Sequence, residues 1–486
     1  MNAAPHSGEH QPLRAIAPLL DAYLAYFESK RTPFTIPGHK QRASRLDAGL
    51  GQVVDGDTPL YGGLDEIKLT HQTLAKAEKL AAELWGGDYA RFSTGGSTHA
   101  NQAIVLSLGK PGDKVAVTRT AHRSILSALV LAGLEPLWLT PEIDEATGVP
   151  LGIPLAELQR VIDQNPIALL LTEPGYLGTI SDLPALIELA HSREIPVVLD
   201  AAWGGHFGFH PDLPRHAMQI GADALITSTH KALPGYSASA LLVAKGRYLN
   251  LDRLEQSFET THTTSPAGAP LASIDGCRAL LQTRGVELNS ELLRNIGNFR
   301  NRVQSHFDIP LFLTPENFPA GRFDPTKIVL RANQLGASGV DIERSLETHR
   351  IRVEMADRDT VVFLATLADS EIEFTHLADV LIPILQANQS APRETATALS
   401  WSVVPQVGIS MREAYFADTH MVAASAAVGK ISADLIAPYP PGVAVVAPGE
   451  ILTEQIVTGL LASKAAGVRI AYATDSSLQN FRVVKD

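Results

Sequence analysis

The chain has 486 residues, of which 45% are hydrophobic and 19% are charged, and its formal net charge is −12. This length favours two or three domains with a large buried core, and the acidic balance argues against nucleic acid or an anionic membrane as a partner. The single cysteine, Cys277, excludes an internal disulfide and is typical of a reducing cytosol. Because the N-terminus has no hydrophobic signal region and no apolar run approaches about 18 residues, we expect a cytoplasmic protein.

The spacing of apolar residues predicts two helices near the N-terminus, at 13–27 and 74–84, with a loop-rich stretch between them. From about residue 90 to 245, short apolar runs alternate with helical patterns. This alternation is typical of an α/β domain whose mainly parallel sheet is covered on both faces. The predicted strands lie at 114–118, 137–139, 168–171, 196–199, 224–226 and 240–243, and the predicted helices at 97–108, 123–132, 155–164, 183–191 and 214–220.

The pattern changes after Ser265-Pro266. A long helix is predicted over 271–307, and a mixture of strand and helix follows, as in an α+β domain. The composition of 386–395 is typical of a linker. We therefore predict an N-terminal segment, a large ligand-binding domain and a C-terminal α+β domain, spanning 1–70, 71–308 and 309–486.

Three chemical groups are expected to meet at one edge of the predicted sheet. Lys231 ends the segment Ser228-Thr229-His230-Lys231 after one strand, and Asp200 directly follows another. A loop of small residues, Gly95-Gly96-Ser97-Thr98, opens a predicted helix. Because ligands of open α/β sheets bind outside the carboxyl ends of the strands, these groups are expected to converge on one crevice.

A lysine, an acid and such a loop are what pyridoxal phosphate requires from a protein. Lys231 would supply the amine for a Schiff base, and Asp200 would keep the pyridine nitrogen protonated, so that the ring accepts electrons. The backbone N–H groups of Gly96, Ser97 and Thr98 would hold the phosphate at a helix N-terminus. Each signal is weak alone, but their order and placement together predict a pyridoxal phosphate site.

Other residues are predicted to surround the cofactor. The flat imidazole of His122 follows the strand at 114–118 and could stack on the pyridine ring, while Ser228 and His230 could donate hydrogen bonds to the phosphate. Lys231 needs a lowered pKa for imine exchange, which desolvation can supply. No metal site is expected, because the remaining histidines, His206, His210 and His216, are irregularly spaced.

These motifs resemble the prokaryotic ornithine/lysine/arginine decarboxylase family, whose members have the aspartate-aminotransferase-like fold of pyridoxal phosphate enzymes (fold type I). The C-terminal signature makes the resemblance more specific than the fold alone. The similar segments are Ile36-Pro37-Gly38-His39-Lys40, Gly63-Leu64-Asp65-Glu66, Gly96-Ser97-Thr98, Thr120-Ala121-His122-Arg123-Ser124, Glu173-Pro174-Gly175-Tyr176-Leu177-Gly178, Ser228-Thr229-His230-Lys231, Thr263-Thr264-Ser265-Pro266, Tyr439-Pro440-Pro441-Gly442 and Pro448-Gly449-Glu450.

One departure from the family pattern follows the strand at 196–199. The chain reads Asp200-Ala201-Ala202-Trp203-Gly204, where many members have Asp-Glu-Ala-His-Gly. A tryptophan at this place is similar to the degradative lysine/arginine branch, so the resemblance adds Trp203 to the cofactor-binding residues. The chain also resembles the shorter members, which carry no N-terminal wing domain.

The resemblance implies α-decarboxylation of lysine, arginine or ornithine, with pyridoxal 5'-phosphate as cofactor, to an amine of polyamine biosynthesis. It also implies a homodimer with active sites at the interface, and a larger assembly stays open. The implied catalytic residues are Lys231, Asp200 and His122. Thr264 and Ser265 would reach the phosphate region across the dimer interface.

A basic substrate needs an acid for its distal ammonium or guanidinium group. Glu354 is placed like a glutamate of the family, and Asp65 and Glu66 are the other candidates. The choice among these acids, the identity of the basic amino acid, and the group that protonates Cα, Lys231 or a histidine, stay open.

Two alternative functions stay open. Another pyridoxal phosphate reaction on this fold, such as transamination or aldol cleavage, would bind the α-carboxylate with an arginine, for which Arg352 and Arg412 are candidates. A non-catalytic regulator that keeps the fold is disfavoured by the intact Lys231, Asp200 and His122. A keto-acid product would favour the first alternative, and bound cofactor without turnover the second.

Overall fold

The computed structural model describes residues 15–60, 64–65, 72–145, 147–395, 403, 406–439, 442–465 and 467–485. A seven-stranded sheet forms its centre, in the order β1-β9-β8-β7-β6-β2-β3. Strands β3, β2, β6, β7 and β8 run parallel, whereas β9 pairs antiparallel with both β8 and β1. The strands are β1 (Tyr89–Ser93), β2 (Lys114–Thr118), β3 (Glu135–Leu139), β6 (Leu169–Thr172), β7 (Val197–Asp200), β8 (Ala224–Ser228) and β9 (Ala240–Ala244).

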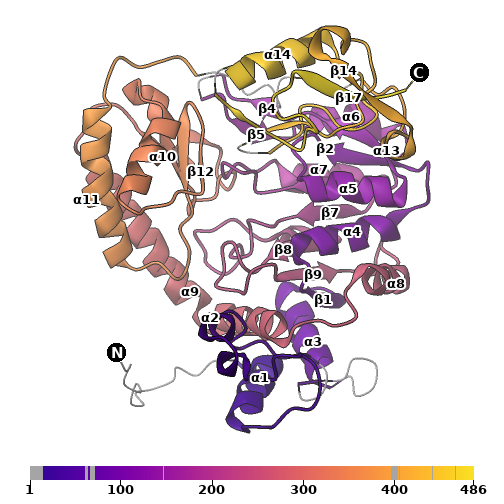
Figure 1. Cartoon of the computed structure of the whole chain (residues 1–486), viewed down its shortest axis with the longest axis vertical. Helices are drawn as coiled ribbons and strands as arrows, with labels where there is room; N and C mark the ends of the chain where they lie inside the picture. Colours follow the sequence, from indigo (N-terminus) through magenta and orange to yellow (C-terminus); the bar gives the residue numbers. More distant parts are fainter. Residues whose placement is uncertain are drawn as a thin grey trace.

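All six predicted strands are present, and the mainly parallel sheet is confirmed. β1 was not predicted, because Arg91 interrupts its apolar residues. The central strands are buried on both faces, since consecutive residues of β6, such as Leu169 and Leu170, belong to cores on opposite faces of the sheet. Figure 1 shows the helices arranged around this sheet. One core includes α3 (Thr73–Trp85), α6 (Leu155–Ile162), α7 (Leu183–His191) and α9 (Gly268–Gln304), and the other α4 (Gly96–Leu108), α5 (Arg123–Ala132) and α8 (Leu251–Thr261).

Several predicted helices differ from the structure. The helix predicted at 214–220 is wrong in extent and type, because only a 3-10 turn, Ala217–Ile220, forms there before Gly221 takes a left-handed φ of 106°. Helix α8 was not predicted, since its sequence is largely polar. The N-terminal helix α1 (Pro18–Glu28) begins at a proline, which suits the first helical position. The loop-rich stretch also contains the short helix α2 (Ala48–Val53).

Residues beyond α9 form two main hydrophobic cores, and a smaller cluster brings Val329 together with Val443. The first combines a four-stranded antiparallel sheet with α10, α11 and the end of α9, and the second includes α14 and the last strand of the chain. Figure 1 shows α10 and α11 to one side of the large sheet, and α14, β14 and β17 near the end of the sheet at which β2 lies. The elements are β10 (Phe312–Leu313), β11 (Ile328–Arg331), α10 (Gly339–Thr348), β12 (Met355–Ala356), β13 (Thr360–Phe363), α11 (Glu371–Ala387), α13 (Met411–Phe416), β14 (Thr419–Ala423), β15 (Ala437–Tyr439), α14 (Glu454–Ala465), β16 (Arg469–Ala471) and β17 (Asn480–Val484); within the large sheet's connections lie β4 (Glu142–Ile143) and β5 (Pro150–Gly152).

The predicted boundaries 1–70, 71–308 and 309–486 stay predictions. We propose that the C-terminal segment 309–486 is itself divided near 386–395, because one of its main cores lies before this stretch and the other after it. Among the described parts of the chain, no helix is long and apolar enough to cross a membrane.

A buried ion pair joins the last core to the large sheet. Arg119 follows β2, and its Nη1 and Nη2 donate to Glu450 Oε1 and Oε2 at 2.7 and 2.9 Å. Both side chains are only 2% exposed. The backbone N–H of Ala447 also donates to Glu450 Oε2, at 2.8 Å. Glu450 of the Pro-Gly-Glu segment therefore has a structural role where the last core of the chain meets the large sheet.

Replacing Glu450 with glutamine is expected to lower the free energy of unfolding by about 3 kcal/mol, because the buried Arg119 guanidinium loses its counter-charge. Urea unfolding of the full chain measures this. The matched control is Glu347→Gln, since Glu347 pairs with Arg352 at 3.4 Å on the surface and should change stability by less than about 1 kcal/mol. Equal losses for the two variants would contradict the structural role.

Candidate active site

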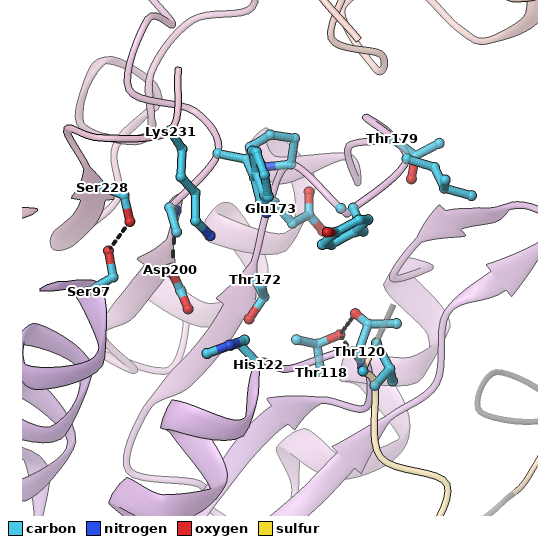
Figure 2. A pocket seen from close by; sticks show the side chains of 18 of the residues that line it. Ser97, Thr118, Thr120, His122, Thr172, Glu173, Thr179, Asp200, Ser228 and Lys231 are labelled. Carbon is cyan, nitrogen blue, oxygen red and sulfur yellow. Dashed lines mark hydrogen bonds between the residues drawn. The ribbon is translucent and has the colours of Figure 1, made fainter. Parts of the chain in front are cut away.

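A cavity of about 600 Å³ opens at the carboxyl ends of β2, β6, β7 and β8. Figure 2 shows Lys231, Asp200 and His122 around one hollow, with Ser97 and Ser228 at its side. The predicted cofactor residues that line it are Gly96, Ser97, Thr98, His122, Asp200, Trp203, Ser228, His230 and Lys231. Parallel strands bring these groups together because their carboxyl ends share one edge of the sheet.

Lys231 lies in the loop that follows β8. The Thr229 N–H donates to the Ser239 carbonyl at 3.0 Å, which holds this loop against β9. Lys231 Nζ lies 4.2 Å from the centroid of the Trp203 ring. Burial lowers the pKa of Lys231, and the nearby carboxylates of Asp200 and Glu354 oppose this only in part. The amine is therefore more readily available in its neutral, nucleophilic form than that of a surface lysine.

Asp200 is the last residue of β7 and is only 3% exposed. Its Oδ2 accepts a hydrogen bond from Asn101 Nδ2 at 2.8 Å, and its Oδ1 accepts one from the Ala202 N–H at 3.2 Å. These donors fix the orientation of the Asp200 side chain at the cavity wall. Sequence reasoning missed Asn101, although a polar residue within the apolar pattern of 97–108 was a usable signal.

His122 caps the N-terminus of α5 and lines the cavity. Its Nδ1 accepts from the Ser124 N–H at 3.3 Å and lies 2.8 Å from Ser124 Oγ. The ring is open to the cavity, yet desolvation by the surrounding protein lowers the pKa of His122; Asp200 opposes this change and Lys231 adds to it. A neutral, flat imidazole is therefore held at the wall of the cavity.

A cradle for an anion lies at the N-terminus of α4. Gly96 has a φ of 69°, which favours glycine, and a Cβ there would approach the Ala238 carbonyl at 3.6 Å. Ser97 Oγ lies 2.8 Å from Ser228 Oγ (Figure 2). His230 Nδ1 lies 2.9 Å from the Ser239 carbonyl, which orients its ring. Hydroxyls and helix N–H groups therefore gather where the sequence places the phosphate loop.

Glu354 reaches the same cavity from the four-stranded part of the chain. Its Oε1 accepts a hydrogen bond from Tyr176 Oη at 2.8 Å. The Tyr176 ring packs edge-on against Trp203, with 5.4 Å between the centroids. Burial and Glu354 raise the pKa of Tyr176, so the phenol stays a neutral donor. A carboxylate is thus held in the cavity that also contains the amine of Lys231.

Asp65, another of the candidate acids, is not brought to this cavity. Asp65 accepts hydrogen bonds from the N–H groups of Thr73 and Leu74, at 2.9 and 2.6 Å, and so caps α3. Glu66 lies outside the described residues. Thr264 and Ser265 are exposed and do not line the cavity of their own chain.

Neither arginine suggested for α-carboxylate binding lines the cavity. The side chain of Arg352 is 86% exposed. Arg412 Nη1 donates to the carbonyls of Val130 and Leu131 at 2.9 and 2.7 Å, so this side chain holds α13 against α5. The structure therefore does not favour the transamination alternative.

The C-terminal part supplies further lining residues that were not predicted individually. Tyr439, Gly442, Val443 and Tyr472 line the cavity. Pro440 and Pro441 of the predicted C-terminal segment lie outside the described residues. The ring of Tyr472 packs against Arg123, whose Cζ lies 4.4 Å from the ring centroid. Part of the wall therefore comes from a segment more than 200 residues after Lys231 in the chain.

Comparisons with known proteins agree with this architecture. The model of the "Orn/Lys/Arg decarboxylase, major domain" family matches residues 17–320, and that of the family's C-terminal domain matches residues 398–469. An arginine decarboxylase of Bacillus subtilis is 32% identical over 482 residues, which covers 96% of this chain and 98% of that protein.

Two solved structures show the same fold. A lysine decarboxylase of Francisella novicida superposes with a TM-score of 0.81 at 21% identity, covering 97% of this chain and 81% of the other. A ureidoglycine-glyoxylate aminotransferase of Bacillus subtilis superposes with a TM-score of 0.53 at 15% identity, covering 66% and 86%. The predicted α/β architecture of fold type I is thereby confirmed. The match of the major-domain model over more than half of the residues and the identity along nearly the whole length establish that the chain belongs to the Orn/Lys/Arg decarboxylase family of enzymes.

Proposed function

We propose that this enzyme uses pyridoxal 5'-phosphate to remove the α-carboxyl group of a basic amino acid, with arginine as the first candidate and lysine and ornithine as the others. The observation that carries the proposal is that Lys231, Asp200, His122 and the carboxylate of Glu354 line one cavity. The names of the relatives support the order of candidates, since the Bacillus subtilis protein is named an arginine decarboxylase and the Francisella novicida protein a lysine decarboxylase.

The residues present fit the cofactor. Lys231 would carry it covalently, Asp200 would hold a proton at the pyridine nitrogen, and His122 would pack on the ring. The phosphate would be bound by Ser97, Thr98, Ser228, His230 and the N–H groups that begin at Gly96, and Trp203 would form a side wall. When bound, the cofactor supplies an electron sink for the pair that the departing carboxylate leaves behind.

The substrate would be held at its distal end by Glu354. Tyr176 Oη donates to one oxygen of this carboxylate, and a carboxylate has two oxygens with which to accept from an ammonium or guanidinium group. Asp65 is engaged in capping α3, so Glu354 is our choice among the predicted acids. The group that protonates Cα stays open between Lys231 and a histidine of the cavity.

We also propose that the enzyme is a homodimer in the cytoplasm that supplies an amine for polyamine biosynthesis. The N-terminal part exposes large apolar side chains, and such surfaces on soluble proteins often mark contacts with partners. The exposure of Thr264 and Ser265 leaves them available to the cavity of a second copy. Sedimentation velocity tests this assembly, and a monomer at micromolar concentration would contradict it. The exposed apolar residues include Ile16, Phe34, Leu46 and Val53.

Product analysis by mass spectrometry tests the reaction. The enzyme is loaded with pyridoxal phosphate and given arginine, lysine, ornithine and a neutral amino acid in separate reactions. Agmatine, cadaverine or putrescine together with CO2 is the expected outcome, and the neutral amino acid should remain unchanged. A keto acid from any of them would instead indicate transamination, and cofactor binding without turnover would contradict an enzymatic role.

Replacing Glu354 with glutamine is expected to raise KM for the basic substrate about tenfold or more, because a charge-assisted hydrogen bond is lost while the shape is kept. Cofactor occupancy, read from the absorbance band, should change little. Steady-state kinetics measure the effect, with Glu347→Gln as a surface control on the neighbouring helix α10. An unchanged KM would contradict the assignment of Glu354.

A further inference from the structure

A second lysine lies behind the wall of the cavity and takes no part in the function proposed above. Lys327 is only 3% exposed and precedes β11. A Cβ on Gly178 would lie 2.8 Å from Lys327 Cγ, so this glycine, at a φ of 96°, leaves room for the lysine stem. Among the described residues, Lys327 Nζ has no hydrogen-bond partner. Burial of an unpaired ammonium is costly, which calls for an explanation.

The nitrogen of Lys327 is held among aromatic rings that line the cavity. Nζ lies 3.7 Å from the centroid of the Trp203 ring and 5.9 Å from that of the Tyr176 ring. Tyr176 is also the residue that donates to Glu354. Lys327 itself does not line the cavity but contacts a ring that does, so its charge acts on the site through the protein.

The charged groups that face Lys327 come from three parts of the chain. Asp324 and Glu354 attract its ammonium, and Lys231 repels it. Asp324 is the stronger attraction of the two. Its Oδ1 accepts from Thr326 Oγ1 at 2.7 Å and lies 3.2 Å from His206 Nε2, while its Oδ2 has no hydrogen-bond partner among the described residues. Of the two carboxylates, Glu354 is the one that lines the cavity, and so the one whose surroundings a ligand changes.

We propose that Lys327 is a specificity-determining counter-ion that Glu354 shares with the buried Asp324, and that its ammonium releases its proton to solvent when the distal cation of the substrate binds at Glu354. This proposal rests on the proposed function, in which Glu354 binds that cation. Lys327 touches neither substrate nor cofactor in this account. It sets how strongly Glu354 attracts a cation, and it couples that attraction to pH.

The sign of the coupling follows from the charges. Burial lowers the pKa of Lys327 to about 8, against the attraction of Asp324 and Glu354 and with the repulsion of Lys231. A cation at Glu354 would lower the pKa of Lys327 further, because a second positive charge then lies beside the ammonium. Below about pH 8 the protonated lysine therefore opposes binding of a cation, and above it the opposition is lost.

A simple guanidinium ligand tests this without chemistry at the cofactor. Butylguanidine carries the distal group of arginine but has neither an amine nor a carboxylate that could react. Its inhibition constant is measured against decarboxylation from pH 7 to 9 in the holoenzyme, with neutral butylurea beside it. In the unmodified enzyme, inhibition by butylguanidine should strengthen about fivefold as pH rises, the size of an ordinary coupling between two sites. Butylurea should show no such change.

Two variants separate the counter-ion role from a packing role. Lys327→Met removes the charge, so it should bind butylguanidine at pH 7 about as tightly as the unmodified enzyme does at pH 9, with no dependence on pH. Lys327→Arg keeps a permanent charge and should bind weakly at every pH. A packing or cation–π role predicts the opposite order, with arginine rescuing the site and methionine damaging it.

The controls keep the two proposals distinguishable. Lys245→Met changes a partly buried lysine that donates to the Met218 carbonyl at 3.1 Å, and it should behave like the unmodified enzyme. The cofactor absorbance band, read without ligand, shows whether each variant has folded. If only one of the two Lys327 variants folds, that variant alone is enough for the test. If the unmodified enzyme decarboxylates no basic amino acid, the proposed function falls and this inference with it. If it does so, but a Lys327 variant keeps the pH dependence of butylguanidine inhibition, only the inference is overturned.

Discussion

Replacing Lys231 with alanine is expected to reduce decarboxylation about a thousandfold or more, the scale seen when a group that acts covalently is removed. The structure explains why no other amine replaces it. Lys231 Nζ lies inside the cavity beside Trp203, with its pKa lowered by burial. Another lysine near the site, Lys327, is buried against the Trp203 ring and does not line the cavity.

Two measurements read out the Lys231 variant. Amine production is followed by mass spectrometry, and covalent attachment of the cofactor is followed by its absorbance band and by borohydride reduction to a fixed adduct. The variant should lose amine production and the covalent attachment of the cofactor at residue 231, while its urea unfolding midpoint changes little. Lys245→Ala is the control and should keep both. Amine production at the unmodified rate in the Lys231 variant would contradict the role of this residue and, with it, the mechanism.

Replacing Asp200 with asparagine is expected to lower kcat by about 100- to 1,000-fold, the range for loss of one preorganised electrostatic group. The shape of the side chain is retained, but its negative charge is lost. Both carboxylate oxygens accept hydrogen bonds, from Asn101 Nδ2 and the Ala202 N–H, so an amide would place its NH2 group against one of these donors. Proton retention at the pyridine nitrogen should therefore fail even when the cofactor binds.

The control for Asp200 is a second buried acid on the same sheet. Asp223 is 2% exposed and lies at the opposite end of β8, where it accepts from the Val197 N–H at 2.8 Å. Asp223→Asn removes the same charge and should lower stability without changing kcat for the molecules that remain folded. Steady-state kinetics with the active-site concentration determined from bound cofactor make this comparison. Similar losses of kcat in both variants would show that Asp200 acts through stability alone.

The central sheet and the residues at its carboxyl edge were predictable because their signals are local. A buried parallel strand appears in the sequence as a continuous apolar run, so β2, β6, β7 and β8 could be predicted from the sequence alone. Asp200 follows one such run directly and Lys231 follows another within a few residues, and a small-residue loop before a helix marks the phosphate cradle. The weaker elements were missed where this signal fails, as in β1, which is interrupted by Arg91, and in the polar helix α8.

Contacts between distant segments were beyond local patterns. Glu354 could be suggested from its position, but its partner Tyr176 lies 178 residues away in the chain. Asn101 meets Asp200, and Arg119 meets Glu450, only because packing brings together residues that are 99 and 331 positions apart in the chain. The predicted acids also show the limit, since the sequence does not distinguish Asp65, which caps a helix, from Glu354, which lines the cavity.

The sequence by itself therefore determined the sheet, the order of the cofactor motifs along the chain and the family. Periodicity and short motifs encode these features within a few residues. Only the tertiary structure decided which acid lines the site and that the C-terminal part contributes to its wall. It also decided that Lys327, whose Nζ has no hydrogen-bond partner among the described residues, lies against the Trp203 ring. The physical reason is that burial, hydrogen bonding and charge compensation depend on neighbours that the folded chain brings together from remote positions.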